Sequence, residues 1–288
     1  MNKAEAIIRL TRIEHSAMLA VAVIVAEIIT RALPGAPVLV LSLATPIFVS
    51  MGAFALNDYF DVAADTVNKM RRPLVVGAMN RDEALAIGAG TLLVGIAASL
   101  FINLPALVTA IVFAIIAVLY SYRLKDMPLV GNIFIALSMA IPFIYGDFVV
   151  AGALRQSIVV IAVVVFLSGL AREIHGMMRD YAGDVKARRT RNFVRMIGAK
   201  RASYAALALY IGAIMASAYM FFYTAPFAYN AVYLIPIIAV DAALLCLSLG
   251  YIGKPSRRFF DSARNASLAA MAASILVFLA AALVYIRI

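Results

Sequence analysis

The sequence predicts an all-α fold, a polytopic membrane bundle of about nine transmembrane helices. The chain has 288 residues, of which 65% are hydrophobic and only 14% are charged, whereas soluble domains carry roughly 25% charged residues. Apolar runs recur along the whole chain, and most are close to the ~20 residues that a helix needs to cross a bilayer. Positive charges gather in alternate joints between these runs, which is typical of multi-pass membrane proteins.

Each apolar run predicts one helix. The expected spans are 16–33, 36–57, 82–101, 104–121, 129–151, 157–178, 202–223, 229–251 and 265–287. Pro34 and Pro105 mark joints between runs. Pro46 and Pro142 fall inside runs and predict kinks that neighbouring helices can accommodate. Residues 1–15 form a short basic amphipathic stretch, which we expect to lie along the membrane surface.

The distribution of positive charge predicts the orientation of the chain. All but three of the 25 lysines and arginines lie in the N-terminal segment or in the loops after the even-numbered spans. The exceptions are Arg31, Arg155 and Arg287. The positive-inside rule therefore predicts a multi-pass protein of the cell membrane with a cytoplasmic N-terminus and an external C-terminus. It also explains the net charge of +10 without a nucleic-acid partner, because the basic residues are scattered over loops.

A first cluster of carboxylates ends the second span. The stretch NDYFDVAAD, residues 57–65, places Asp58, Asp61 and Asp65 at spacings that fall on one face of a helix. Like charges this close destabilise a helix unless something offsets them. Mg²⁺ is a natural partner, because it binds one or two carboxylates and completes its shell with water and substrate phosphates. Ion pairs at a solvated helix end are the alternative.

A second cluster ends the sixth span. The stretch DYAGD places Asp180 and Asp184 four residues apart, again on one helix face. Both clusters lie at the cytoplasmic ends of even-numbered spans. We therefore expect a single domain over 1–288 that contains two four-helix halves, one around 58–65 and the other around 180–184.

Basic residues accompany both clusters. Arg71 and Arg72 follow the first, Lys186 and Arg189 follow the second, and Lys125 ends the fourth span. Carboxylates, Mg²⁺ and cationic side chains together form a clamp for a diphosphate. We expect this clamp at a central cavity that opens near the cytoplasmic face. A substrate with an anionic head and an apolar tail, such as a prenyl diphosphate, would suit it. The clamp would favour departure of the diphosphate and formation of an allylic carbocation.

These motifs resemble those of a known family. NDYFDVAAD resembles the NDxxDxxxD motif of the UbiA superfamily of intramembrane prenyltransferases, and DYAGD resembles its DxxxD motif. RRPLVVG, residues 71–77, and YSYRLK, residues 120–125, resemble segments that follow the first motif and the fourth span. The resemblance covers essentially the whole chain, and it implies Mg²⁺-dependent transfer of a prenyl group to a lipophilic acceptor in the bilayer.

The resemblance also implies roles for individual residues. The expected magnesium ligands are Asp58, Asp61, Asp65, Asp180 and Asp184, and among them Asp58, Asp61 and Asp180 are the expected catalytic residues. The expected substrate-binding residues are Asn57, Arg72, Tyr120, Lys125, Lys186 and Arg189.

The acceptor is less strongly indicated. REIHGMMRDYAGD, residues 172–184, resembles the form of the second motif found in archaeal ether-lipid enzymes of the family, which favours geranylgeranylglyceryl phosphate as the acceptor. Gly176, Met177 and Arg179 stand where that form has Lys, Asp and Glu, so an aromatic acceptor of quinone biosynthesis stays open. His175 is either a general base for an alcohol acceptor or a simple polar residue at a helix end.

A membrane transporter is the alternative from another functional class. Transporters favour charged residues on broken helices at the bilayer midplane, whereas the carboxylates here lie at the ends of spans. The GxGD motif of intramembrane aspartyl proteases fails because residue 181 is Tyr. No feature of the sequence predicts an oligomeric state.

Overall fold

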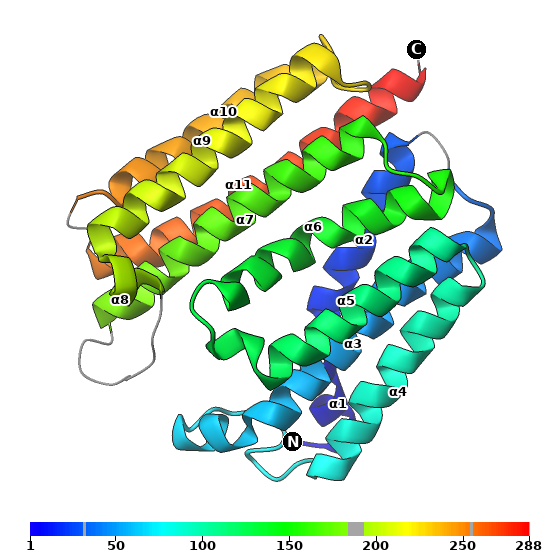
Figure 1. Ribbon diagram of the computed structural model, residues 1–288, viewed down its shortest axis with the longest axis vertical. Coiled ribbons are helices and arrows are strands. Elements are labelled where there is room, and N and C mark those ends of the chain that lie inside the picture. Colours follow the sequence, from blue (N-terminus) through cyan, green and yellow to red (C-terminus); the bar gives the residue numbers. More distant parts are fainter. Residues whose placement is uncertain (31–32, 184–192, 254–255, 288) are drawn as a thin grey trace. The chain divides into compact units, whose positions relative to one another are not determined.

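The computed structural model describes residues 1–30, 33–183, 193–253 and 256–287, and the side chains of 180–183 and 286–287 lie outside this description. Within these residues the regular elements are all helices, which confirms the predicted all-α class (Figure 1). The helices are α1 Lys3–Thr11, α2 Ile13–Ile29, α3 Ala36–Val67, α4 Arg81–Leu100, α5 Leu104–Tyr122, η1 Leu124–Asp126, α6 Val130–Ala151, α7 Gln156–Gly183, α8 Phe193–Ile197, α9 Ala199–Tyr223, α10 Ala231–Gly250 and α11 Arg257–Arg287.

Eight helices of the described chain are long and apolar enough to cross a membrane: α3, α4, α5, α6, α7, α9, α10 and α11. The remaining expected span corresponds to α2, which has 17 residues and is therefore about 26 Å long. This is slightly shorter than the ~30 Å hydrocarbon core of a bilayer. The chain is thus a multi-pass membrane protein, and the count of nine spans stays a prediction.

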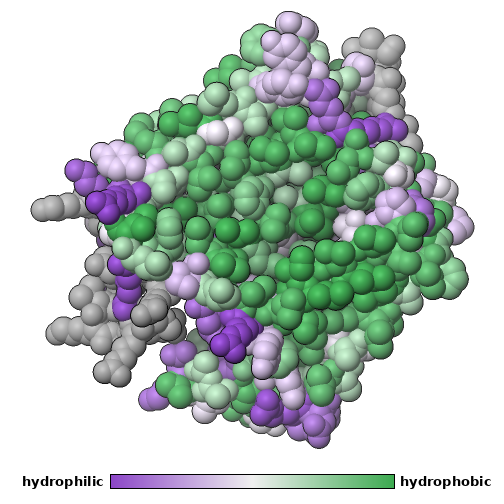
Figure 2. Space-filling view, in the orientation of Figure 1, coloured by the Kyte–Doolittle hydropathy of each residue, from purple (hydrophilic) through white to green (hydrophobic). Residues whose placement is uncertain are grey.

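The surface agrees with a lipid environment. In the space-filling view, hydrophobic side chains cover broad areas of the visible face, and hydrophilic ones gather toward its margins (Figure 2). Large apolar side chains such as Leu93, Leu104, Met215 and Ile235 are strongly exposed on these helices. Soluble monomers rarely expose apolar area on this scale, so lipid is the expected contact of these faces.

The chain forms two compact units. The first comprises Met1–Glu27, Ala32–Lys125 and Tyr145–Ala153, and the second comprises Ile28–Arg31, Asp126–Ile144 and Leu154–Ile288. The first unit contains the motif at 57–65, and the second contains the motif at 180–184.

The first unit is held together by close packing of α3 against α4. A side-chain carbon added at Gly52 would lie 2.7 Å from the carbonyl oxygen of Gly88, and one added at Gly95 would lie 2.9 Å from the backbone nitrogen of Val49. Small residues let helix backbones approach closely in membranes, where packing rather than water drives association. The close contact between α3 and α4 therefore fixes the position of α3, which carries the first motif.

The N-terminal helix α1 also packs on the first unit. Its buried residues Ala6 and Leu10 contact a cluster formed with Ala55, Met79 and Ala84. The amphipathic segment expected at the membrane surface therefore buries Ala6 and Leu10 against its own protein and leaves Ile7 and Ile8 exposed.

In the second unit, α7 packs against α9 and α11, and α10 packs against the same two helices. Gly169 of α7 brings that helix close to Ala136 and Met139 of α6. Tyr233 is fully buried, and its hydroxyl shares a hydrogen bond with Ser217 at 2.9 Å. Contacts with α9 and α11 therefore position α7, which carries the start of the second motif at its C-terminal end.

Candidate functional site

The carboxylates of the first motif lie on one continuous helix. α3 runs to Val67, so the end predicted at residue 57 is too early. With 32 residues it is about 48 Å long, well beyond the ~30 Å hydrocarbon core. The polar end of α3 therefore continues the helix beyond the length that the apolar core of a bilayer can cover. Asp58, Asp61 and Asp65 belong to this end, as the spacing predicts.

Asp58 is enclosed by two arginines. Its side chain is 1% exposed. Arg12 donates a hydrogen bond from Nη2 to its Oδ1 at 2.8 Å, and Arg72 donates from Nη1 to the same oxygen at 3.1 Å. Nε of Arg72 also lies 3.9 Å from Oδ2 of Asp65. Removing one partner from a buried ion pair is strongly destabilising, so these arginines allow a carboxylate to be buried here.

A folded turn after α3 brings Arg72 to Asp58. The backbone N–H of Val76 donates to the carbonyl of Arg72 at 3.0 Å, and that of Ala78 donates to the carbonyl of Pro73 at 3.0 Å. Gly77 adopts a φ of +71°, a left-handed conformation that glycine adopts at little cost. The RRPLVVG segment is therefore a structured turn that positions a cation over the carboxylates.

Arg12 reaches the same carboxylate from the N-terminal side. Its left-handed backbone ends α1, with φ of 46°, and its N–H donates to the carbonyl of Ile8. Its guanidinium lies 4.6 Å from the centre of the Phe54 ring, within range of a cation–π contact. Burial lowers the pKa of Arg12 while the Asp58 carboxylate opposes that change, and arginine stays charged in proteins.

Asp61 is positioned by two further residues. Lys125, in the short helix η1, donates a hydrogen bond to Oδ1 of Asp61, and Asn57 donates to Oδ2 at 3.1 Å. Tyr120, predicted to bind substrate, lies half-buried near the end of α5. The structure thus gathers Asn57, Arg72 and Lys125 around the first motif, and it adds Arg12, which the sequence reasoning had counted only as a topology charge.

The donor atoms of this cluster suit Mg²⁺ at Asp61 and Asp65. Their side chains are 25% and 15% exposed, and Asn57 adds an amide oxygen. No group of three or more His, Cys, Asp or Glu side chains forms a cage for a metal ion within the described part of the chain. Mg²⁺ needs no such cage when substrate phosphates supply other ligands. Asp58 is enclosed by arginines, so its predicted role as a magnesium ligand stays a prediction.

The second motif lies mostly outside the described residues. Asp180 belongs to α7 by its backbone, and its side chain is not among those described. Asp184, Lys186 and Arg189 lie outside the described residues. The second magnesium site therefore stays a prediction.

His175 lies in the interior of the second unit. It is 4% exposed, and its ring stacks on Tyr251 with 3.7 Å between centroids and 3° between planes. It lines a cavity together with Arg172, Glu173 and Arg179 of the same helix. His175 is therefore a buried residue of α7 and not a solvent-exposed polar residue at a helix end.

Comparison with known proteins places the chain in a family. The sequence profile of the UbiA prenyltransferase family matches residues 17–268. Digeranylgeranylglyceryl phosphate synthase of Archaeoglobus fulgidus is 31% identical over 245 residues, which span 85% of this chain and 83% of that protein. The enzyme of the same name from Methanoregula boonei is 34% identical over 236 residues, 82% of each chain.

Solved structures agree with the sequence relatives. One described as digeranylgeranylglyceryl phosphate synthase superposes with a TM-score of 0.84 at 25% identity, covering 98% of this chain and 99% of that one. A UbiA homologue from Aeropyrum pernix superposes with a TM-score of 0.74 at 20% identity, covering 96% and 99%; it supports the fold alone. The chain belongs to the UbiA prenyltransferase family.

Proposed function

We propose that this protein transfers a prenyl group from a prenyl diphosphate to geranylgeranylglyceryl phosphate in a Mg²⁺-dependent reaction. The observation that carries the proposal is the cluster at the end of α3, where Asp58, Asp61 and Asp65 meet Arg72 and Lys125. Both relatives reported above carry the name digeranylgeranylglyceryl phosphate synthase, and each alignment spans more than two thirds of both chains. This supports the choice of acceptor.

Different residues of the cluster would bind the metal and the diphosphate of the donor. Asp61 and Asp65, with Asn57, would hold Mg²⁺ beside the diphosphate. Bound there, the metal supplies charge neutralisation for the leaving group. Arg72 and Lys125 oppose the negative charge that develops on the diphosphate as the allylic C–O bond breaks. Contacts with the carboxylates of the cluster would hold Arg72 and Lys125 close to the bound diphosphate.

The reaction exchanges one C–O bond for another. The electron pair of the breaking bond leaves with the diphosphate, and the allylic carbon becomes cationic. The hydroxyl oxygen of the acceptor then bonds to that carbon and its proton passes to the departing diphosphate, so that an ether and protonated free diphosphate result. The apolar helices exclude water, which would otherwise capture the cation.

The second motif offers a further set of charged residues. Asp180 and Asp184 would hold a second Mg²⁺, and Lys186 and Arg189 would contact phosphate oxygens. Asp58 would support ionisation by holding Arg72, which donates a hydrogen bond to it. The charge distribution of the loops supports a cytoplasmic N-terminus and an external C-terminus. With that orientation, we expect the helix ends that carry the two motifs to face the cytoplasm.

A turnover assay tests this function. The full chain in lipid nanodiscs receives Mg²⁺, labelled geranylgeranyl diphosphate and, separately, geranylgeranylglyceryl phosphate, 4-hydroxybenzoate or 1,4-dihydroxy-2-naphthoate. We expect a labelled diether. A prenylated aromatic product instead would overturn the acceptor, and absence of diphosphate release with every acceptor would overturn prenyl transfer.

A further inference from the structure

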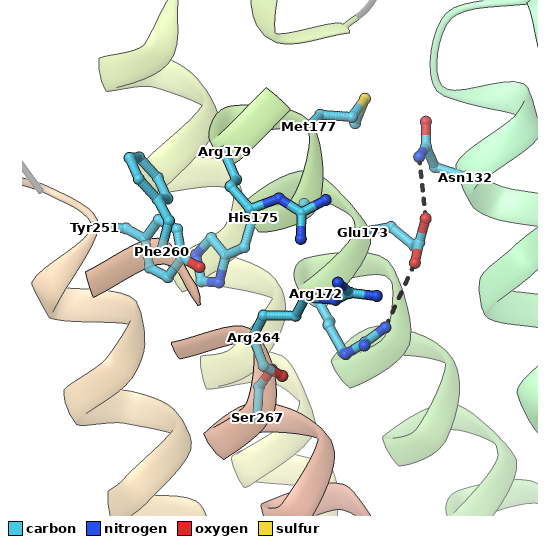
Figure 3. A pocket seen from close by; sticks show the side chains of 11 residues that line it. Asn132, Arg172, Glu173, His175, Met177, Arg179, Tyr251, Phe260, Arg264 and Ser267 are labelled. Atoms are coloured by element: carbon cyan, nitrogen blue, oxygen red, sulfur yellow. Dashed lines mark hydrogen bonds and ion pairs between the residues drawn. The ribbon is translucent and has the colours of Figure 1, made fainter. Parts of the chain in front are cut away.

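A polar cavity of about 230 Å³ lies within the second unit. It is lined by residues of α6, α7 and α11 together with Tyr251, which follows α10 (Figure 3). Its charged and polar lining residues include Asn132, Arg172, Glu173, His175, Arg179 and Arg264. These residues come from different helices, so the cavity depends on the tertiary structure and not on one local motif.

Among the described lining residues, arginines outnumber carboxylates. Arg172, Arg179 and Arg264 contribute three guanidinium groups, and Glu173 is the one carboxylate among the described lining residues. Its Oε1 lies 3.7 Å from Nη1 of Arg172, and Asn132 donates to its Oε2 at 3.4 Å (Figure 3). Guanidinium groups from α7 and α11 thus line one cavity, which favours an anionic ligand.

Two buried polar atoms in the cavity wall have no hydrogen-bond partner among the described residues. They are Nε of Arg172 and Nε2 of His175, which lie three residues apart on α7 and so share a face. The stack with Tyr251 fixes the His175 ring. Buried polar atoms almost always have partners, so this pair indicates a ligand that carries oxygen atoms.

The chemistry of the cavity selects a phosphate group. Guanidinium groups bind phosphate through paired hydrogen bonds. Phe260 and Met177 add apolar surface to the lining, which suits the start of a lipid chain.

We propose that this cavity binds the phosphate of the acceptor through Arg172, Arg179 and Arg264, with Nε2 of His175 facing the glycerol moiety. The inference rests on the proposed function, because it requires an acceptor that carries a phosphate. It assigns the acceptor headgroup to this cavity, whereas the proposed function assigns the donor diphosphate to the two aspartate motifs.

Steady-state kinetics of an Arg264→Gln variant test the assignment. Arg264 is exposed, so its replacement leaves the packing of α11 in place. The full chain in nanodiscs of zwitterionic lipid is assayed with saturating labelled geranylgeranyl diphosphate against geranylgeranylglyceryl phosphate. We expect the KM for this acceptor to rise about tenfold or more, as loss of a hydrogen bond to a charged group implies. The KM for the donor should not change.

Three controls make the result specific. Arg258→Gln removes an exposed arginine of the same helix that does not line the cavity, and it should leave the acceptor KM unchanged. Arg264→Lys keeps the charge but loses the planar fork, and it should give an intermediate KM and keep the assignment testable if Arg264→Gln does not fold. Geranylgeranylglycerol, which lacks the phosphate, should be used equally poorly by wild type and Arg264→Gln.

The outcomes separate the two proposals. If wild type makes the diether and both Arg264 variants keep the wild-type KM, the cavity assignment is overturned and the proposed function stands. If wild type releases diphosphate but prenylates only aromatic acceptors, the acceptor proposal and the cavity assignment both fall. If added anionic phospholipid inhibits wild type, and Arg264→Gln removes this inhibition without changing the acceptor KM, the cavity is a site for bilayer lipid and the assignment is overturned.

Discussion

Two long helices, α3 in the first unit and α7 in the second, differ in the ratio of carboxylates to cations around their polar ends. Around α3, the carboxylates of Asp58, Asp61 and Asp65 face the cations of Arg12, Arg72 and Lys125. Around the polar end of α7, three arginines share a cavity with a single described carboxylate. The first cluster has equal numbers of carboxylates and cations, whereas arginines outnumber carboxylates among the described residues of the second.

This difference suggests two ways of binding a phosphate in a membrane protein. A cluster with equal numbers of carboxylates and cations has no net positive charge to attract a diphosphate. The donor therefore has to bind together with Mg²⁺, which the carboxylates of the cluster can coordinate. A surplus of arginines binds a phosphate directly, without a metal. The comparison therefore predicts that donor binding depends on Mg²⁺ and that acceptor binding does not.

The largest expected effect comes from removing a carboxylate of the first cluster. We expect Asp61→Asn to lower prenyl transfer at least about 100-fold, because Lys125 loses its partner and the metal loses a ligand. Asp82→Asn, an exposed carboxylate at the start of α4, serves as the matched control. Turnover with excess Mg²⁺ measures both variants, and normal turnover in Asp61→Asn would contradict the diphosphate clamp.

An intermediate effect is expected from Arg12. Arg12→Gln should lower the free energy of unfolding by about 1–3 kcal/mol, because it removes a charged hydrogen bond from a buried carboxylate. Thermal unfolding in detergent measures the change. Arg9→Gln, which removes an exposed pair with Glu5, should cost less than about 0.5 kcal/mol.

A double-mutant cycle sharpens this prediction. If the Arg12 effect arises from the Asp58 charge, combining Arg12→Gln with Asp58→Asn should cost less than the sum of the two single changes. Strict additivity would show that Arg12 stabilises the protein through other contacts, such as the Phe54 ring.

The smallest expected effect comes from removing negative charge from the cavity of the second unit. Glu173→Gln removes the described carboxylate of the cavity while keeping its shape. The KM for geranylgeranylglyceryl phosphate should then fall about two- to fivefold. The substitution removes the repulsion between the Glu173 carboxylate and the phosphate, which is roughly 1 kcal/mol for two charges in water at close range. The same assay that tests Arg264 measures it, and a rise in KM would mean that Glu173 itself contacts the acceptor.

The sequence predicts the apolar part of the fold well and the polar helix ends poorly. Hydropathy locates the spans because lipid requires long apolar runs. It ends the second span at residue 57, although α3 continues to Val67, and it begins the last at 265, although α11 begins at Arg257. Once a helix has left the hydrocarbon, its polar residues stay helical for reasons that a hydropathy pattern does not record.

The candidate site was predictable where its residues lie near one another in the chain. The spacing of Asp58, Asp61 and Asp65 reveals a helix face, and Arg72 follows closely. Arg12 lies 46 residues before Asp58, and Arg264 lies on a different helix from Arg172. Such pairs leave no periodic signal, because only the tertiary packing brings them together.

The position of α1 has a consequence for how the protein is made. Its buried residues Ala6 and Leu10 rest on Ala55, Met79 and Ala84, all of which are synthesised later. At 5–20 residues per second, Asp58 follows Arg12 by about 2–9 s. A helix that leaves the ribosome before its partners has nothing to dock on until α3 and the start of α4 are in place. The cluster at the end of α3 is therefore assembled around a segment that is synthesised early and docks late.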